Sequence, residues 1–247
     1  MTIGDYFVDP AYMLYAITLV LFIPMFIFGI VASARVNSVF SKYNKVRVSS
    51  GISAETYVRN FLNVSGVNGI RFAAVRGSLT DNFNPKNNTI SLSDTVRGSA
   101  TAGAIGVACH EAGHAVQHAK KYFFSSARLA LVPIVNFASG LIWPIFIVGY
   151  ILGLGTTYGQ IGNIFIFAGL GVMGLSLLFS LVTLPTEFNA SARAYSYLKT
   201  CLLPDEAKAV RKVLTAAAMT YVASFMMTSL QFLRFLALLL INTRRRR

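Results

Sequence analysis

Acidic residues and cysteines are scarce in this chain of 247 residues, which holds nine Asp and Glu and two Cys. Two cysteines without a C-x-x-C spacing form neither a disulfide framework nor a cysteine-based zinc site. Charged residues make up only 13% of the chain, about half the share usual in soluble proteins. The composition therefore excludes a disulfide-stapled secreted domain and an ordinary soluble domain.

Long apolar runs replace the missing charge, since 55% of the residues are hydrophobic and the mean hydropathy is +0.59. Three runs are long enough to cross a bilayer: residues 11–34, 129–152 and 161–184. A fourth run, 213–241, contains Gln231 and Arg234, so it either spans the membrane or lies at the interface. These runs predict a mainly α integral membrane protein in the lipid bilayer, with three to four transmembrane helices.

Basic residues give the chain a net charge of +13. In a protein with apolar spans, such an excess indicates cytoplasmic loops and contact with anionic lipid, so we expect no nucleic-acid partner. Asp5 and Asp9 precede the first run, and Arg35 and Lys42 follow it. This asymmetry predicts a multi-pass protein of the cell membrane whose polar segments, 36–125 and 186–212, lie in the cytoplasm.

The first polar segment, 36–125, has the pattern of a small α+β domain. Ser53 can cap a helix over residues 54–64, and residues 70–75 and 89–92 are typical of strands separated by the turn formers of residues 81–88. A second helix is predicted from about residue 99 to 120. The strand before that helix can bind an extended peptide by edge pairing.

All three histidines lie in one ten-residue stretch, 110–119, of this predicted second helix. The first five residues of the stretch, His110-Glu111-Ala112-Gly113-His114, spell H-E-x-x-H. One turn separates His110 from His114, so both imidazoles project to one side. Two such imidazoles can bind Zn²⁺, and Glu111 is placed to act as a general base. The alternative is a chance match of solvated polar residues, which an otherwise Ala-, Gly- and Val-rich helix disfavours because burying them is costly.

A catalytic zinc site requires a third protein ligand. His118 lies about 12 Å along the helix from His110 and cannot reach the same ion. Among the nine acids, those near the N-terminus are predicted to lie outside, and most others are typical of turns or helix ends. Glu187 remains as the candidate ligand. The alternative role for Glu187 is an interfacial acid paired with Arg193.

Several stretches resemble the YugP-type membrane neutral zinc metallopeptidases of bacteria: residues 79–83, 106–119, 184–191 and 216–223. The resemblance implies a gluzincin-like, zincin-type site in the cytoplasmic α+β domain, with Zn²⁺ held by His110, His114 and Glu187 and with Glu111 as the base. More distant families carry an Asp in place of Ser191, where it orients a ligand histidine. Ser191 is therefore a candidate hydrogen-bond partner of a ligand histidine. His118, on the same helix as the ligand histidines, is a second such candidate.

The sequence thus predicts a zinc-dependent metallopeptidase that hydrolyses a peptide or protein substrate at the cytoplasmic membrane face. A zinc-binding scaffold without catalysis is the alternative, although a structural site would not need Glu111. A transporter is disfavoured because the apolar runs carry little charge apart from Arg234. Tyr195, Tyr197 and His118 are candidates for stabilising an oxyanion. The sequence does not define the oligomeric state.

Overall fold

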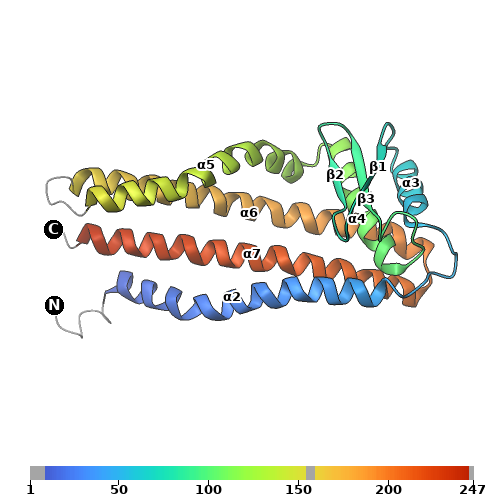
Figure 1. Ribbon diagram of the computed structural model, residues 1–247, viewed down its shortest axis with the longest axis horizontal. Coiled ribbons are helices and arrows are strands. Elements are labelled where there is room, and N and C mark those ends of the chain that lie inside the picture. Colours follow the sequence, from blue (N-terminus) through green and yellow to red (C-terminus); the bar gives the residue numbers. More distant parts are fainter. Residues whose placement is uncertain (1–8, 154–158, 245–247) are drawn as a thin grey trace. The chain divides into compact units, whose positions relative to one another are not determined.

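Four long helices carry most of the chain in the computed structural model, which describes residues 9–153 and 159–244. They are α2 (Pro10–Tyr43), α5 (Phe123–Gly153), α6 (Gly159–Cys201) and α7 (Pro204–Arg244) (Figure 1). Each contains a stretch long and apolar enough to cross a membrane, by length and composition. The predicted class, a mainly α membrane protein with a small α+β part, is confirmed. Asp5, used above to orient the chain, lies outside the described residues.

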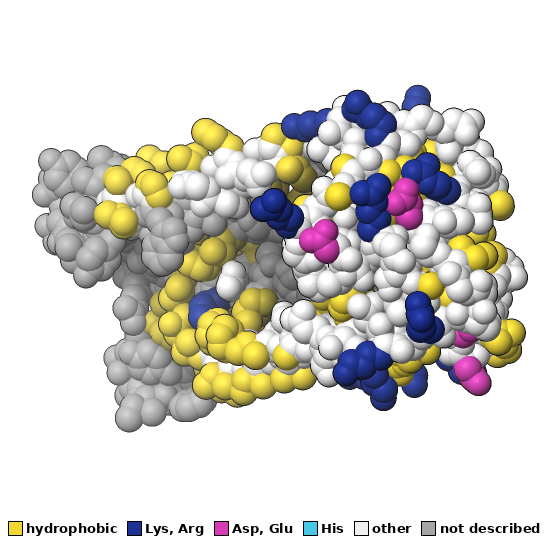
Figure 2. Space-filling view, turned by 45° about the vertical axis from the view of Figure 1, so that its right-hand side comes forward, with side chains coloured by type: hydrophobic (Ala, Val, Ile, Leu, Met, Phe, Trp, Pro, Cys, Tyr) yellow, Lys and Arg dark blue, Asp and Glu magenta, His cyan; other side chains and the backbone are white. Residues whose placement is uncertain are grey.

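The chain divides into two units, which are described separately. The helical unit comprises residues 1–29, 128–182 and 222–247, and the mixed unit comprises residues 30–127 and 183–221. On the face drawn in Figure 2, hydrophobic side chains are frequent over the described part of the first, whereas most Lys and Arg side chains lie over the second. The assignment of segments to the two sides of a membrane stays a prediction.

The mixed unit contains the short elements predicted from the sequence. Helix α3 (Ala54–Val64) begins where Ser53 accepts a hydrogen bond from the Thr56 N–H, and β1 (Arg71–Val75) and β3 (Thr89–Ser93) follow. The turn-rich stretch between these strands also forms β2 (Asn82–Asn84). This third strand was not predicted, because its asparagines and the adjacent proline favour turns.

The three strands form a sheet in the order β1-β3-β2, with β1 parallel and β2 antiparallel to β3. The strand that precedes the H-E-x-x-H helix is therefore the central one, and both its edges are paired. The expectation that this strand binds a peptide by edge pairing is wrong, and β2 is the edge strand beside that helix. Helix α4 (Ala102–Ala119) packs against α3, β2 and β3 (Figure 1).

Candidate metal centre

Helix α4 carries the H-E-x-x-H motif in the core of the mixed unit. Thr101 caps its N-terminus by accepting a hydrogen bond from the Ala104 N–H at 3.4 Å. Its alanines and glycines are almost all buried, which is possible because small side chains let neighbouring helices approach closely. The polar side chains His110, Glu111 and His114 are only partly buried, so the helix presents them at an edge of an otherwise apolar core.

Gly113 sets the distance between α4 and α6. A Cβ atom at this position would lie 2.6 Å from the carbonyl oxygen of Ala190, closer than real Cβ contacts. Glycine is therefore required where the two backbones meet. This contact brings Glu187, which lies one turn before Ala190 on α6, beside the histidines of α4.

His110, His114 and Glu187 form a group whose ligand atoms all lie within 4.8 Å of one another. The Nε2 atoms of the two histidines are 3.2 Å apart, and Glu187 Oε2 lies 3.1 Å from one and 3.4 Å from the other. Donors about 2.0–2.1 Å from a tetrahedral zinc are separated by about 3.3 Å. The three atoms thus have the spacing of one face of a zinc tetrahedron, and Zn²⁺ fits the site.

The other ring nitrogens of both histidines have partners of their own. Nδ1 of His110 lies 3.0 Å from the Ser191 hydroxyl, and Nδ1 of His114 lies 3.0 Å from Gln117 Oε1. The buried Gln117 amide nitrogen donates to the Thr186 carbonyl oxygen and to Asn189 Oδ1, which fixes the amide orientation. Its oxygen therefore accepts the His114 Nδ1 proton, so the lone pair of Nε2 points into the cluster.

The electrostatics of the cluster favour a cation. Burial lowers the pKa of His114, but its hydrogen bond with Glu187 and the charge of that carboxylate outweigh burial and raise the pKa above its ordinary value. The two histidine Nε2 atoms and Glu187 Oε2, all of which carry lone pairs, face one another. The Glu187 side chain is only 2% exposed. Such an arrangement needs positive charge at its centre, which either protons or a metal ion can supply.

Glu111 lies beside the cluster but is not one of its three ligand groups. Its Oε2 atom accepts a hydrogen bond from the Phe83 backbone N–H at 2.9 Å. Burial raises the pKa of Glu111, while the neighbouring imidazoles oppose that rise. Edge strand β2 therefore holds the carboxylate in place through its main chain, and the environment makes Glu111 a stronger base than a solvated carboxylate.

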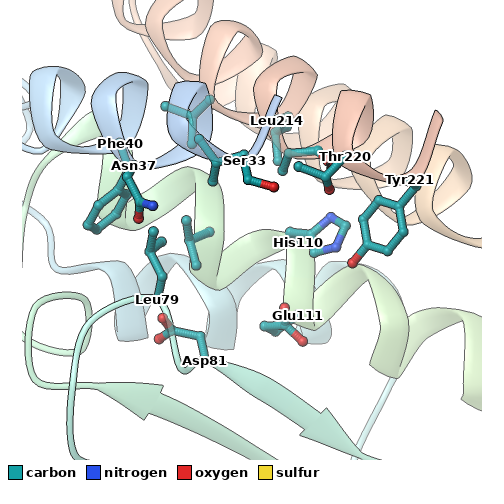
Figure 3. Close-up of a pocket in the computed structure, with 14 residues that line it drawn as sticks. Ser33, Asn37, Phe40, Leu79, Asp81, His110, Glu111, Leu214, Thr220 and Tyr221 are labelled. Carbon is teal, nitrogen blue, oxygen red and sulfur yellow. Dashed lines mark hydrogen bonds between the residues drawn. The ribbon is translucent and has the colours of Figure 1, made fainter. Parts of the chain in front are cut away.

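A cleft of about 450 Å³ opens over this part of α4, with α2 and α7 forming its other wall. His110 and Glu111 line it, together with the loop that contains Leu79 and Asp81 (Figure 3). Figure 3 also shows Tyr221 of α7 with its hydroxyl directed towards His110. Sequence reasoning missed Tyr221 because it is distant in the chain from every motif residue, although it lies in the 216–223 stretch of the family resemblance.

Other candidate residues lie away from the cluster. The exposed His118 ring packs against Phe83 with ring centres 5.9 Å apart. Tyr197 stacks on Phe61 with ring centres 4.9 Å apart, and Tyr195 also packs against the hydrophobic core. Arg193, the alternative partner of Glu187, donates to Asn189 Oδ1 at 2.7 Å. The hydrogen-bond partner of His114 Nδ1 is Gln117, which no sequence motif singled out, and not the predicted candidate His118.

A membrane protein whose H-E-x-x-H helix meets a carboxylate from a second helix has the arrangement typical of a membrane zinc metallopeptidase. Comparison with known proteins agrees with this class. The chain belongs to the family described as "Putative neutral zinc metallopeptidase", whose model matches residues 18–240. The family resemblance read from the sequence is therefore confirmed.

One relative is "Putative membrane protease YugP" of Bacillus subtilis (strain 168). It is 37% identical to this chain over 211 residues, which cover 85% of this chain and 90% of the relative. No solved structure matches the chain significantly.

Proposed function

We propose that this protein is a gluzincin-like zinc metallopeptidase that hydrolyses peptide bonds at the cytoplasmic face of the membrane. The observation that carries the proposal is the convergence of His110, His114 and Glu187 at zinc-ligand spacing. A cleft beside them is lined by a carboxylate with a raised pKa. A scaffold that only binds zinc would need the three ligands but not the base.

Each residue has a separate task in this reaction. His110, His114 and Glu187 would hold the zinc ion, which when bound would polarise a carbonyl and lower the pKa of water towards about 7. Glu111 accepts a proton on its carboxylate from the attacking water and later passes it to the leaving amine. Tyr221 presents its hydroxyl to the cleft, where it donates a hydrogen bond to the substrate carbonyl oxygen.

The position of β2 suggests how a peptide approaches. This strand is at the edge of the sheet and adjoins α4, and its Phe83 N–H contacts Glu111. An extended peptide that pairs with the edge of β2 would bring its backbone next to the base. The substrate is therefore expected to be an unfolded or extended segment of a peptide or protein.

The test compares the purified wild type with Glu111→Gln and Tyr221→Phe in a peptide-cleavage assay, with zinc content measured on the same samples. Glu111→Gln should keep its zinc and lose activity by about 10²–10⁴-fold, because general base catalysis contributes a factor of that size. Tyr221→Phe should lower kcat more than it raises KM, since the hydroxyl acts in the transition state. Undiminished cleavage by zinc-loaded Glu111→Gln would rule out Glu111 as the general base. No cleavage by zinc-loaded wild type would leave only the non-catalytic scaffold.

A further inference from the structure

A second cavity, of about 650 Å³, lies between the parts of α2 and α7 that belong to the mixed unit. Four basic side chains line it: Arg35 and Lys42 from α2, and Arg211 and Lys212 from α7. Among the described residues that line this cavity none is acidic. We call it the basic pocket, and its volume is in the range of small-ligand sites.

Two of the basic side chains of the basic pocket lie near one aromatic ring. The ammonium groups of Lys42 and Lys212 lie 5.7 Å and 5.9 Å from the centre of the same Tyr43 ring. The carboxylates at the start of α7 are engaged elsewhere: Glu206 accepts from the Ser49 and Leu203 N–H groups, and Asp205 pairs with Lys208. No acidic side chain among the described residues that line the basic pocket offsets its four positive charges, so an anion in the pocket would be stabilised.

The sequence places the basic pocket where both helices change character. On α2 the basic residues follow the apolar run 11–34, and on α7 they precede the apolar run 213–241. In a helix that crosses a bilayer, this transition occurs at the level of the lipid headgroups. The non-basic wall includes Val39, Ala216 and Met219, so cationic and apolar surfaces meet in one cavity.

We propose that the basic pocket binds the headgroup of an anionic phospholipid. The positive charge of the pocket suits a phosphate group, and its apolar wall suits the start of the acyl chains. A free phosphate ion would leave that apolar wall uncovered. The same segments of α2 and α7 line the cleft through Val36, Phe40 and Ala217. A lipid in the basic pocket therefore contacts the helices that form one wall of the cleft.

The experiment measures lipid retention by native mass spectrometry of the full-length protein released from nanodiscs of phosphatidylcholine and phosphatidylglycerol. Wild type is compared with Lys42→Gln/Lys212→Gln, with the charge-conserving Lys42→Arg/Lys212→Arg, and with Lys86→Gln/Lys199→Gln. The last pair removes the same charge from exposed lysines outside the pocket. Zinc content of each sample reports folding independently of lipid.

We expect wild type and the Arg pair to retain phosphatidylglycerol in preference to phosphatidylcholine, even with a large excess of inorganic phosphate. Removing two pocket lysines should lower the preference about 25-fold, because each basic side chain near an anionic lipid contributes about a factor of five. The control pair should change it little. Equal losses for both Gln pairs, no preference in wild type, or displacement of the lipid by phosphate would each overturn the proposal.

Discussion

Gln117 connects the two ligand-bearing helices through one buried amide. Its oxygen accepts the proton on Nδ1 of His114, and its nitrogen donates to Thr186 and Asn189 on α6. The amide therefore fixes both the orientation of a ligand imidazole and the position of the helix turn that carries Glu187. Because ligand orientation contributes to metal affinity, Gln117 should matter for zinc binding although it does not touch the ion.

Replacing Gln117 by Met retains the volume of the side chain and removes all three hydrogen bonds. Zinc affinity should fall about 10- to 100-fold, the range found when partners of ligand histidines are removed. The measurement is competition with a chelator, made alongside thermal unfolding of the zinc-free protein. An unchanged zinc affinity would show that the hydrogen bond from His114 to Gln117 does not contribute to zinc binding.

At the scale of elements, the contact between α4 and α6 brings the site together. Gly113→Ala would place a methyl group 2.6 Å from the Ala190 carbonyl oxygen, and because the obstacle is backbone, the helices must separate. Overpacking of this kind costs about 1–3 kcal/mol of stability. Glu187 should then sit farther from the histidines, and zinc should be retained less tightly.

Gly106→Ala is the matched control on the same helix. There the new methyl group would lie 3.4 Å from a Val210 side-chain carbon, which is ordinary contact. This variant should keep its zinc and become slightly more stable, because Ala favours a helix over Gly by about 1 kcal/mol. Equal zinc retention by the two variants would contradict the role assigned to Gly113.

Helix α3 is tied to the loop before α4 by Glu55, which pairs with Arg59 at 2.7 Å and with Arg97 at 2.9 Å. The hydrogen bonds from Arg59 and Arg97 lower the pKa of Glu55 below its ordinary value of 4.5. A lowered folded-state pKa stabilises the fold above about pH 4.5, and that stabilisation is lost as the pH falls through the folded-state pKa.

Glu55→Gln should therefore lower stability by up to about 1 kcal/mol at neutral pH, the usual size for partly exposed ion pairs. The difference from wild type should shrink below about pH 4.5, where the wild-type carboxyl group becomes protonated. Thermal unfolding of both proteins at several pH values measures it. A difference that stays constant down to acidic pH would argue against an ionic origin.

The local elements could be predicted from the sequence because local signals specify them. Helix α3 has the predicted bounds, and α4 begins and ends within a few residues of the predicted ones. Strand β2 could not be predicted, since it forms from turn-type residues only when paired with β3. Gln117 and Tyr221 were missed for a related reason: their roles depend on contacts between distant segments, about which helical periodicity carries no information.

For the molecule as a whole, we predict that the polar segments 36–125 and 186–212 lie on the cytoplasmic side of the membrane. The turn between β2 and β3 contains the exposed Asn87, and of the two native cysteines Cys109 is buried and Cys201 exposed. Asn87→Cys in a Cys201→Ser background should react with an impermeant maleimide in inside-out vesicles but not in intact cells, because basic segments remain cytoplasmic. Labelling in intact cells would show that this segment lies outside the cell, opposite to the predicted orientation.

The proposed zinc site depends on α4 and α6 together, because His110 and His114 come from one helix and Glu187 from the other. The direct measurement is zinc stoichiometry of the purified full-length protein, by elemental analysis of wild type, Glu111→Gln and Glu187→Ala under the same mild chelation. We expect about one zinc per chain for the first two and a clear loss for Glu187→Ala. A full equivalent of zinc in Glu187→Ala would contradict this expectation, because the carboxylate from α6 would then not be a ligand.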